Sequence, residues 1–531
     1  MLNLELGLDE NQSVLRARAA AVAGVEQDRV RGFRLARKSL DARRKGRLRR
    51  LRFIVHADLI LDADHDGDRL RTAVRSGRIV EAPRTASLVV DTPAAGRRNS
   101  RVVVVGAGPA GLYAALVLAT NGVSVDVIDR GAALGRRSRD LVRFHRSRVP
   151  NPESNLLFGE GGAGTYSDGK LYTRVDDPLE VPCLEELVSC GAHADILYDS
   201  RAHIGTDRLH RILPVFRDRL ASKGVRFHFD TRMDSLVLEP RTRSVRAVST
   251  TRGELPCDAL FVAPGHSARD TVHMLARLGV RVEPKPFQLG VRIEHPQELI
   301  DRGRFGSGPE AALLGPAYYN LVCKAGKGLP ATYSFCMCPG GKIVASVNAP
   351  GVLCTNGMSN SMHSSKWANA ALVTTFGPDD YGPGPFDGFE LQRQLEQRFF
   401  EAGGSDYTAP AQQADDFLSG RTTRHPERSS YTFGTCPGRI DLLLPDRAHA
   451  AIARALLRFD RQIPGFAGPD GLLVGLESRS SGPVRLIRDR DSFVAIGFTN
   501  LYPLGEGAGY AGGIMSSAID GARAAKRYLD G

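Results

Sequence analysis

Arg101-Val-Val-Val-Val-Gly106-Ala-Gly108-Pro109-Ala110-Gly111 is the stretch of sequence that decides the fold. Four consecutive valines suit a strand that is buried on both faces, and the glycines follow at the spacing G-x-G-x-x-G. In that motif the first glycine allows a tight turn, the second lets the backbone approach a pyrophosphate, and the third lets helix and strand pack closely. With Pro109 and Ala110 opening the helix, the stretch predicts a phosphate-binding turn.

A second strand completes the unit within about 30 residues. After a helical segment, Val123-Ser-Val-Asp-Val-Ile-Asp129 ends in a carboxylate that can accept hydrogen bonds from a ribose, and Arg130 follows it. The spacing therefore predicts a dinucleotide-binding βαβ unit, with cofactor contacts at Asp129 and Arg130.

Gly159-Glu-Gly161-Gly162-Ala-Gly164 matches the same glycine pattern in a different context. No run of β-branched residues precedes it, so a second βαβ unit is not expected here. Successive glycines let backbone amides approach a ligand closely, and we expect Gly161, Gly162 and Gly164 to lie against the cofactor. The alternative is a mobile surface loop.

The C-terminal segment distinguishes FAD from NAD, because enzymes of both cofactors share the first unit. Gly505-Glu506-Gly-Ala-Gly-Tyr-Ala-Gly512-Gly513-Ile514 resembles the second FAD fingerprint of flavoproteins with two dinucleotide-binding domains. The resemblance implies that Glu506, at a position more often filled by Asp, holds the ribityl or pyrophosphate region. It also implies that Gly505 lies at the cofactor and that the helix start at Gly512, Gly513 and Ile514 lies near the flavin pyrimidine edge.

Two shorter stretches resemble further parts of the same flavoproteins. Phe261-Val-Ala263-Pro-Gly265 stands where they usually carry an Ala-Thr-Gly strand end, from which Pro264 departs. Met233 matches the position whose backbone commonly meets the adenine. The resemblance implies cofactor contacts at Ala263, Gly265 and Met233, in the order of a discontinuous FAD domain.

Composition and pattern together predict the domain organisation. Of the 531 residues 42% are hydrophobic and 24% are charged, as in a soluble globular protein. We expect an α/β fold: a discontinuous FAD/NAD(P)-binding Rossmann-like domain of the three-layer ββα type, an inserted α+β substrate domain and a small basic N-terminal α+β domain. The expected bounds are 1–90 for the N-terminal domain, 91–100 for a linker, 101–286 and 483–531 for the FAD-binding domain, and 287–482 for the inserted domain. Within the FAD-binding domain, a helix over 207–223 and a strand over 492–498 are predicted.

Several strings resemble one group in particular, the uncharacterised bacterial FAD-dependent dehydrogenases. They are Phe158-Gly-Glu-Gly-Gly-Ala-Gly-Thr-Tyr-Ser-Asp-Gly-Lys170, Gly265-His-Ser-Ala-Arg-Asp-Thr271, Gly290-Val-Arg-Ile-Glu-His-Pro296, Phe335-Cys-Met-Cys-Pro-Gly-Gly341 and the C-terminal glycine-rich string. The resemblance covers nearly the whole chain. It implies an FAD-dependent oxidoreductase that acts on a small molecule, and it supplies no substrate.

Four residues are candidates for the chemistry, which FAD itself would carry as hydride transfer between the FAD-binding and inserted domains. Arg292 can bind a substrate carboxylate or phosphate, with a structural pairing to Glu294 on the same strand face as the alternative. His266 can serve as acid or base or be structural. Arg479 precedes the return of the chain to the FAD domain. Because a second βαβ unit is not predicted, reduction would come from a transiently bound NAD(P)H, from the substrate or from a partner protein.

The eight cysteines are scattered and lack the spacing of a disulfide framework or a zinc site, so we expect reduced thiols and no metal. Cys336 and Cys338 share one face of a predicted strand. They could exchange electrons with a flavin, or they could be structural thiols.

The segment Arg29–Arg52 is strongly basic, with twelve basic residues and one acid, Asp41. It could hold RNA, DNA or another anionic partner by phosphate neutralisation, or it could form solvated strand faces, which the near absence of interleaved aromatic residues favours. Two rival functions therefore remain: a flavoprotein that acts on RNA, and a non-catalytic FAD-binding redox sensor. The N-terminus lacks a signal peptide pattern and no apolar run approaches the roughly 18 residues of a membrane span, so we expect a cytoplasmic location. The oligomeric state is not predicted.

Overall fold

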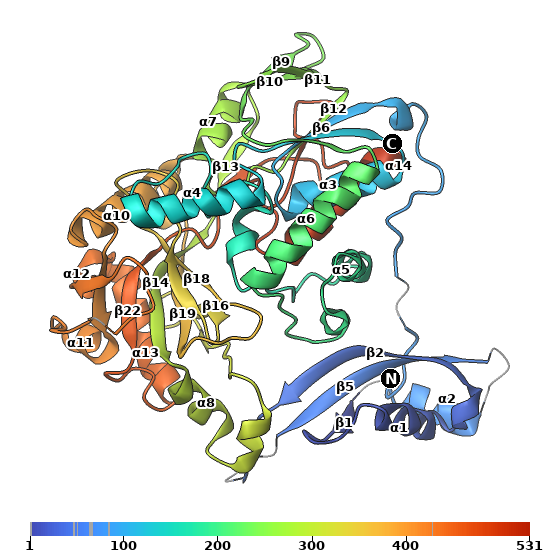
Figure 1. Ribbon diagram of the computed structural model, residues 1–531, viewed down its shortest axis with the longest axis vertical. Coiled ribbons are helices and arrows are strands. Elements are labelled where there is room, and N and C mark those ends of the chain that lie inside the picture. Colours follow the sequence, from blue (N-terminus) through green and yellow to red (C-terminus); the bar gives the residue numbers. More distant parts are fainter. Residues whose placement is uncertain (1–2, 46–47, 50, 63–66, 83–84, 427) are drawn as a thin grey trace.

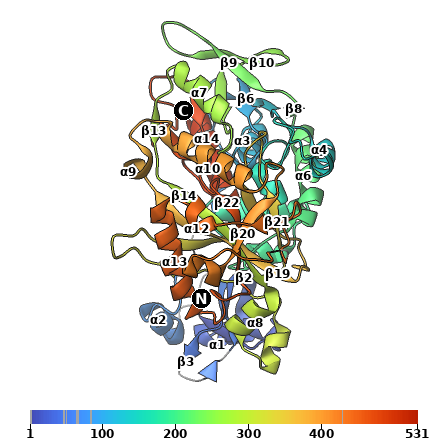
Figure 2. The ribbon, with the colours of Figure 1, turned by 90° about the vertical axis from the view of Figure 1, so that its left-hand side faces the viewer.

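The computed structural model describes residues 3–45, 48, 49, 51–62, 67–82, 85–426 and 428–531. The chain forms a small sheet near the N-terminus, a parallel α/β unit and a large mixed sheet that packs beside it (Figures 1 and 2). We propose the domain bounds given above for these three parts. None of the helices in the described ranges has the length and apolar character that crossing a membrane requires.

The N-terminal part is an antiparallel sheet in the order β1-β5-β2, with two helices packed on it (Figure 1). Its elements are β1 (Leu4–Leu6), α1 (Val14–Ala23), β2 (Val30–Asp41), β5 (Arg52–Leu61) and α2 (Asp68–Arg75). The backbone of Lys38 in β2 donates to Tyr198 O and accepts from Ser200 N, so the edge of this sheet is bonded to the α/β unit. Four arginines of the basic segment make ion pairs, namely Arg31 with Asp62, Arg34 with Asp58, Arg43 with Asp41 and Arg52 with Glu5.

The α/β unit is built on a five-stranded parallel sheet in the order β24-β12-β6-β7-β8. Its strands are β6 (Arg101–Val105), β7 (Ser124–Ile128), β8 (Arg226–His228), β12 (Ala259–Val262) and β24 (Leu501–Pro503). β6 lies in the middle because its valines are buried on both faces. Val102 and Val104 pack with helices α3 (Pro109–Thr120), α6 (Thr206–Ser222) and α14 (Ile514–Asp530), whereas Val103 and Val105 pack with the antiparallel sheet β9–β11.

The unit therefore has the three layers that the sequence predicts: helices, a parallel sheet and an antiparallel sheet. Figure 1 shows β9 (Met233–Leu238), β10 (Val245–Thr250) and β11 (Gly253–Pro256) on the side of the parallel sheet away from α3 and α6. Two further helices, α4 (Leu134–Ser147) and α7 (Arg269–Arg277), follow β7 and β12. The predicted helix over 207–223 is α6.

The strand predicted over residues 492–498 is wrong. Asp489 accepts hydrogen bonds from the backbone amides of Asp491 and Ser492 and from the Ser492 hydroxyl, and Phe493 adopts φ +62°. These bonds close a turn and override the apolar alternation. The strand that joins the parallel sheet is β24, a few residues further on.

The large mixed sheet runs in the order β15-β16-β19-β14-β22-β20-β21. Its elements are β14 (Phe287–Pro296), α8 (Gln297–Phe305), β15 (Val322–Cys323), β16 (Thr332–Cys338), β19 (Trp367–Phe376), α10 (Asp387–Ala402), β20 (Ala409–Gln413), β21 (Thr435–Pro437), α13 (Asp446–Asp460) and β22 (Leu472–Glu477). A hairpin of β17 (Lys342–Ala345) and β18 (Thr355–Met358) packs on it. Nearly every residue of β14 is buried, because both faces of this central strand are covered.

Candidate functional site

In the turn formed by the glycine motif, Gly106 and Gly111 pack tightly against backbone atoms, whereas Gly108 leaves one side of the turn open. A Cβ added at Gly106, where φ is +102°, would overlap Ala263 O, and one at Gly111 would overlap Gly106 O. A Cβ at Gly108 would meet only Gly162 Cα, at 3.8 Å. Gly108 also precedes the first turn of α3. The open side thus lies at a helix N-terminus, where unpaired amides favour a phosphate.

The loop Gly159–Tyr166 packs between this turn and the start of α14. Gly161 N donates to Ala107 O at 2.8 Å, and a Cβ at Gly162 would lie 3.0 Å from Gly108 Cα. A Cβ at Gly164 would lie 3.2 Å from the Ile514 side chain. The three glycines therefore pack between the glycine turn and the start of α14, which the sequence predicts to be parts of one site. The loop is packed in the protein and is not a free surface loop.

Arg137 of α4 holds that loop, and the sequence analysis missed it. Its side chain is fully buried and donates to three backbone carbonyls, those of Asn155, Glu160 and Gly162. A single arginine in a basic helix carries no signal of such a role, because the partners are recognisable only after the chain has folded.

Asp129 connects three backbone segments of the site through its carboxylate. One carboxylate oxygen accepts from Ala107 N at 2.8 Å, and the other accepts from Gly131 N at 2.8 Å and from Gly159 N at 2.9 Å. Burial raises the pKa of this carboxyl, and the three amide donors oppose that effect. These bonds tie the glycine turn, the end of β7 and the loop together. Contact between Asp129 and a ribose stays a prediction.

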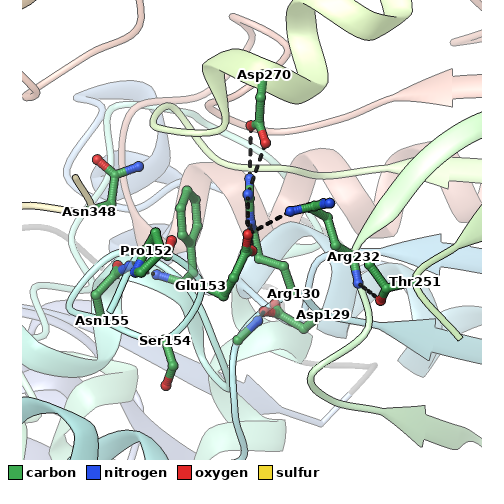
Figure 3. Close-up of polar contacts among 12 residues, drawn as sticks. Asp129, Arg130, Pro152, Glu153, Ser154, Asn155, Arg232, Thr251, Asp270 and Asn348 are labelled. Atoms are coloured by element: carbon green, nitrogen blue, oxygen red, sulfur yellow. Dashed lines mark hydrogen bonds and ion pairs between the residues drawn. The ribbon is translucent and has the colours of Figure 1, made fainter. Parts of the chain in front are cut away.

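Arg130 stands beside it in a network of charges (Figure 3). Its guanidinium bonds Glu153 and Asp270, with Nη1 2.8 Å from Asp270 Oδ1, and Arg232 bonds the same Glu153 at 2.8 Å. Met233, predicted to face the adenine, is buried at the start of β9 beside this network. The network fixes the ends of β7 and β9 relative to α7.

The C-terminal fingerprint lies against the first one. A Cβ at Gly505 would lie 2.9 Å from Ala110 Cβ, and one at Gly507 would lie 2.5 Å from Gly265 O. Gly512 and Gly513 N both donate to the Ser516 hydroxyl at the start of α14. All three sequence segments predicted to form the cofactor site are therefore neighbours in space.

Glu506 provides a test of whether this site fits FAD. Its Oε1 accepts from Gly482 N at 3.1 Å, whereas its buried Oε2 has no hydrogen-bond partner in the described part of the chain. Burial raises the pKa of Glu506 to about 7, although Lys285 and Gly482 N oppose the shift. A buried acceptor without a donor suits a ligand that brings hydroxyl or N–H groups. Together with the open turn at Gly108, it fits FAD.

His266 and Arg479 lie next to this site. His266 packs beside Gly482, and burial with Arg479 and Arg269 nearby lowers its pKa to about 4. Arg479 makes a bidentate pair with buried Glu396 of α10, at 2.8 and 2.7 Å. Burial by itself would raise the pKa of Glu396, but Arg479 and Arg269 outweigh it and hold that pKa at about 2.

Arg292 and Glu294 lie elsewhere, inside the large sheet. Arg292 is fully buried and pairs with Glu477 at 2.9 Å, while Glu294 accepts from the backbone amide and hydroxyl of Ser430. The pairing of Arg292 with Glu294 is thus wrong, because the strand neighbour Glu477 lies closer. Full burial also leaves Arg292 no surface to offer a substrate.

A pocket of about 560 Å³ opens at the boundary of the α/β unit and the large sheet. Four arginines and one acid are among the residues that line it: Arg130, Arg269, Arg393, Arg479 and Asp270. Ser267, next to His266, also lines it. Each of these arginines also pairs with a carboxylate of the protein: Arg130 with Glu153 and Asp270, Arg269 and Arg479 with Glu396, and Arg393 with Glu390.

The chain matches three family models. Residues 99–262 match an FAD binding domain, residues 286–480 match the C-terminal domain of FAD-dependent proteins, and residues 1–56 match a domain of unknown function. An uncharacterised protein of Clostridium beijerinckii is 37% identical over 99% of this chain and 98% of its own length.

Two other matches are weaker. A kynurenine 3-monooxygenase of Salinispora arenicola is 33% identical over 30% of this chain and 34% of its own length. The solved structure of L-proline dehydrogenase from P. horikoshii has 12% sequence identity and a TM-score of 0.34 over 80% of this chain and 92% of its own. Neither likeness is extensive enough to transfer an activity. The match to the Clostridium protein spans both chains, and with the two FAD-related domains it shows that this chain belongs to a family of uncharacterised FAD-dependent oxidoreductases.

Proposed function

We propose that this oxidoreductase transfers a hydride between FAD and an anionic small molecule at the boundary of the FAD-binding and inserted domains. The observation that carries the proposal is the convergence of the open turn at Gly108, the loop at Gly162 and a Glu506 carboxylate oxygen that has no hydrogen-bond partner among the described residues. FAD, when bound, supplies the electron transfer.

The residues around the cofactor would bind it and exclude water. Gly108 leaves room for the pyrophosphate at the N-terminus of α3. Glu506 would accept a hydrogen bond from the cofactor through Oε2. The start of α14 would direct its amides toward negative charge that develops on the reduced flavin.

His266 would accept or return the proton that accompanies the hydride. Its lowered pKa keeps the imidazole neutral near pH 7, so one ring nitrogen has a free lone pair. Its Nδ1 lies 2.9 Å from the Ser267 hydroxyl, which fixes the ring orientation.

The arginine-lined pocket supports an anionic substrate or an anionic electron donor such as NAD(P)H. Four guanidinium groups line the pocket, each of them also paired with a carboxylate of the protein. A guanidinium has five N–H donors, so it can bind a further carboxylate or phosphate.

The test is flavin reduction under anaerobic conditions by NADH, NADPH and a panel of carboxylates and phosphates, with neutral analogues alongside. Reduction by anionic compounds alone is expected, and reduction by none would favour the rival of a non-catalytic redox sensor.

A matched pair of variants on α10 tests the pocket. Arg393 lines the pocket, whereas Arg398 lies on the same helix and bonds Leu443 O. Arg393→Gln should weaken the response to an anionic reductant about tenfold, equivalent to about 1.4 kcal/mol, and Arg398→Gln should not. Equal effects of the two variants would remove the pocket from the substrate path.

A further inference from the structure

Cys336 and Cys338 lie together at an irregular point of β16. The pairing of β16 with β19 shifts register between Phe335 and Cys338, and Cys336 adopts φ +44°, a conformation that non-glycine residues rarely take. The Cys338 thiol donates to the backbone carbonyl of Cys336, with Cys338 Sγ 3.3 Å from Cys336 O. Cys336 is partly exposed and Cys338 is buried. The irregular strand thus places a partly exposed cysteine two residues before a buried one.

Two cations flank the pair from separate elements. Lys170 Nζ lies 4.0 Å from Cys338 Sγ, and Arg292 Nη2 lies 3.9 Å from Cys338 Sγ and 3.1 Å from Cys336 O. Positive charge near a thiol favours its thiolate. The neighbouring Cys338 thiol, with Lys170 and Arg292, lowers the pKa of Cys336, whereas the pKa of Cys338 is raised.

The acidic groups of the cluster have partners of their own. Asp168 lies 2.7 Å from Lys170 Nζ and bonds Ser359, with His363 at 3.4 Å. Glu477 pairs with Arg292, and burial raises its pKa, so it ionises less readily than a surface acid. The charged and titratable groups near Cys336 are Cys338, Lys170, Asp168, Tyr172, Arg292 and Glu477. A thiolate at Cys336 therefore has the Cys338 thiol, Lys170 and Arg292 as its stabilising neighbours.

We propose that Cys336 and Cys338 are a reactive dithiol, with Cys336 as the attacking thiolate and Cys338 as the resolving thiol, and that its substrate is a small-molecule disulfide. The proposal goes beyond the flavin reaction and does not depend on the substrate of that reaction.

The chemistry balances in two exchanges. Cys336 Sγ attacks one sulfur of the disulfide, the S–S bond breaks, and the released thiolate takes a proton from solvent. Cys338 then loses its proton to the second leaving thiolate and attacks Cys336 Sγ, which releases that thiol. The protein dithiol loses two electrons to become the Cys336–Cys338 disulfide, and the substrate disulfide is reduced to two thiols.

Alkylation of the full-length, flavin-containing protein with iodoacetamide, followed by peptide mass spectrometry, tests the thiolate. Cys436 is the matched control, because it is also partly exposed and burial raises its pKa. Cys336 should react with a midpoint at least about one pH unit below the ordinary thiol value of about 8.5. Lys170→Met should raise that midpoint, and Lys170→Arg should preserve it. A midpoint at the ordinary value, or a rate at pH 6 equal to that of Cys436, would overturn the proposal.

The second exchange is tested with 2-hydroxyethyl disulfide. Wild-type protein should form the internal Cys336–Cys338 disulfide, Cys338→Ser should retain a stable mixed disulfide on Cys336, and Cys336→Ser should do neither. The absence of both the internal bond and the trapped adduct would refute the dithiol. Retention of the flavin spectrum in all three proteins separates this result from failure of the proposed flavin reaction.

Discussion

Arg292 on β14 and Glu477 on the neighbouring strand β22 form an ion pair of 2.9 Å, with both side chains buried. Removing one partner leaves the other charge buried and uncompensated. Glu477→Leu should therefore lower the free energy of unfolding by about 3–5 kcal/mol. The double variant Arg292→Met/Glu477→Leu should recover most of that loss. Urea unfolding measures both, and a double variant no more stable than the single one would contradict this account.

Glu506 should make the stability of the apoprotein depend on pH. Its pKa is raised to about 7, so the folded state holds the proton more tightly than the unfolded chain does. The resulting stabilisation is complete below about pH 4.5 and is lost as the pH rises through about 7, by at most about 3 kcal/mol.

Glu506→Gln should abolish this dependence while weakening FAD retention, since an amide is a poorer acceptor than a carboxylate. Urea unfolding of the apoprotein at pH 5 and pH 8, with FAD titration of the same samples, checks both effects. An unchanged pH dependence in the variant would assign it to another group.

The parts of the site that could be predicted from the sequence are those set by local geometry. A Cβ at Gly106 or Gly111 would overlap a backbone oxygen, so both positions require glycine. This requirement is visible in the sequence as the glycine motif. The resemblance at Glu506 likewise pointed to a residue with an oxygen that, within the described part of the chain, has no partner and so suits a ligand.

The parts that could not be predicted depend on partners distant in sequence. Arg292 meets Glu477 from a strand far along the chain, and Arg479 meets Glu396 from a helix. Alternation along β14 indicates that Arg292 and Glu294 share a face, but it carries no information about the strand next to it. For the same reason the sequence analysis missed Arg137, because its carbonyl partners lie in a loop that is distant in sequence.

Glu396 should contribute to acid stability. Its pKa is lowered to about 2, so its stabilisation is present above about pH 4.5 and is lost as the pH falls toward about 2. That loss should amount to about 3 kcal/mol. Glu396→Gln should be less stable at pH 6 and show a weaker decline between pH 5 and pH 3 in urea unfolding.

Glu390→Gln is the control for Glu396→Gln, because Glu390 lies on the same helix with its pKa also at about 2 but is exposed, so solvent screens its pairing with Arg393. Equal effects would show that burial of Glu396 is not the cause.

Gly108 should be the glycine at which a methyl group removes the cofactor and leaves the fold intact. A Cβ there meets only Gly162 Cα at 3.8 Å, so Gly108→Ala should fold normally while its methyl group occupies space needed by the pyrophosphate. We expect FAD affinity to fall at least about tenfold, or about 1.4 kcal/mol, with the thermal midpoint of the apoprotein unchanged.

Gly135→Ala is the matched control for Gly108→Ala, because a Cβ at Gly135, in the first turn of α4, meets nothing within 4 Å. It should keep its FAD and gain slightly in stability from the better helix propensity of alanine. Full flavin absorbance in purified Gly108→Ala protein would show that the pyrophosphate does not approach this turn.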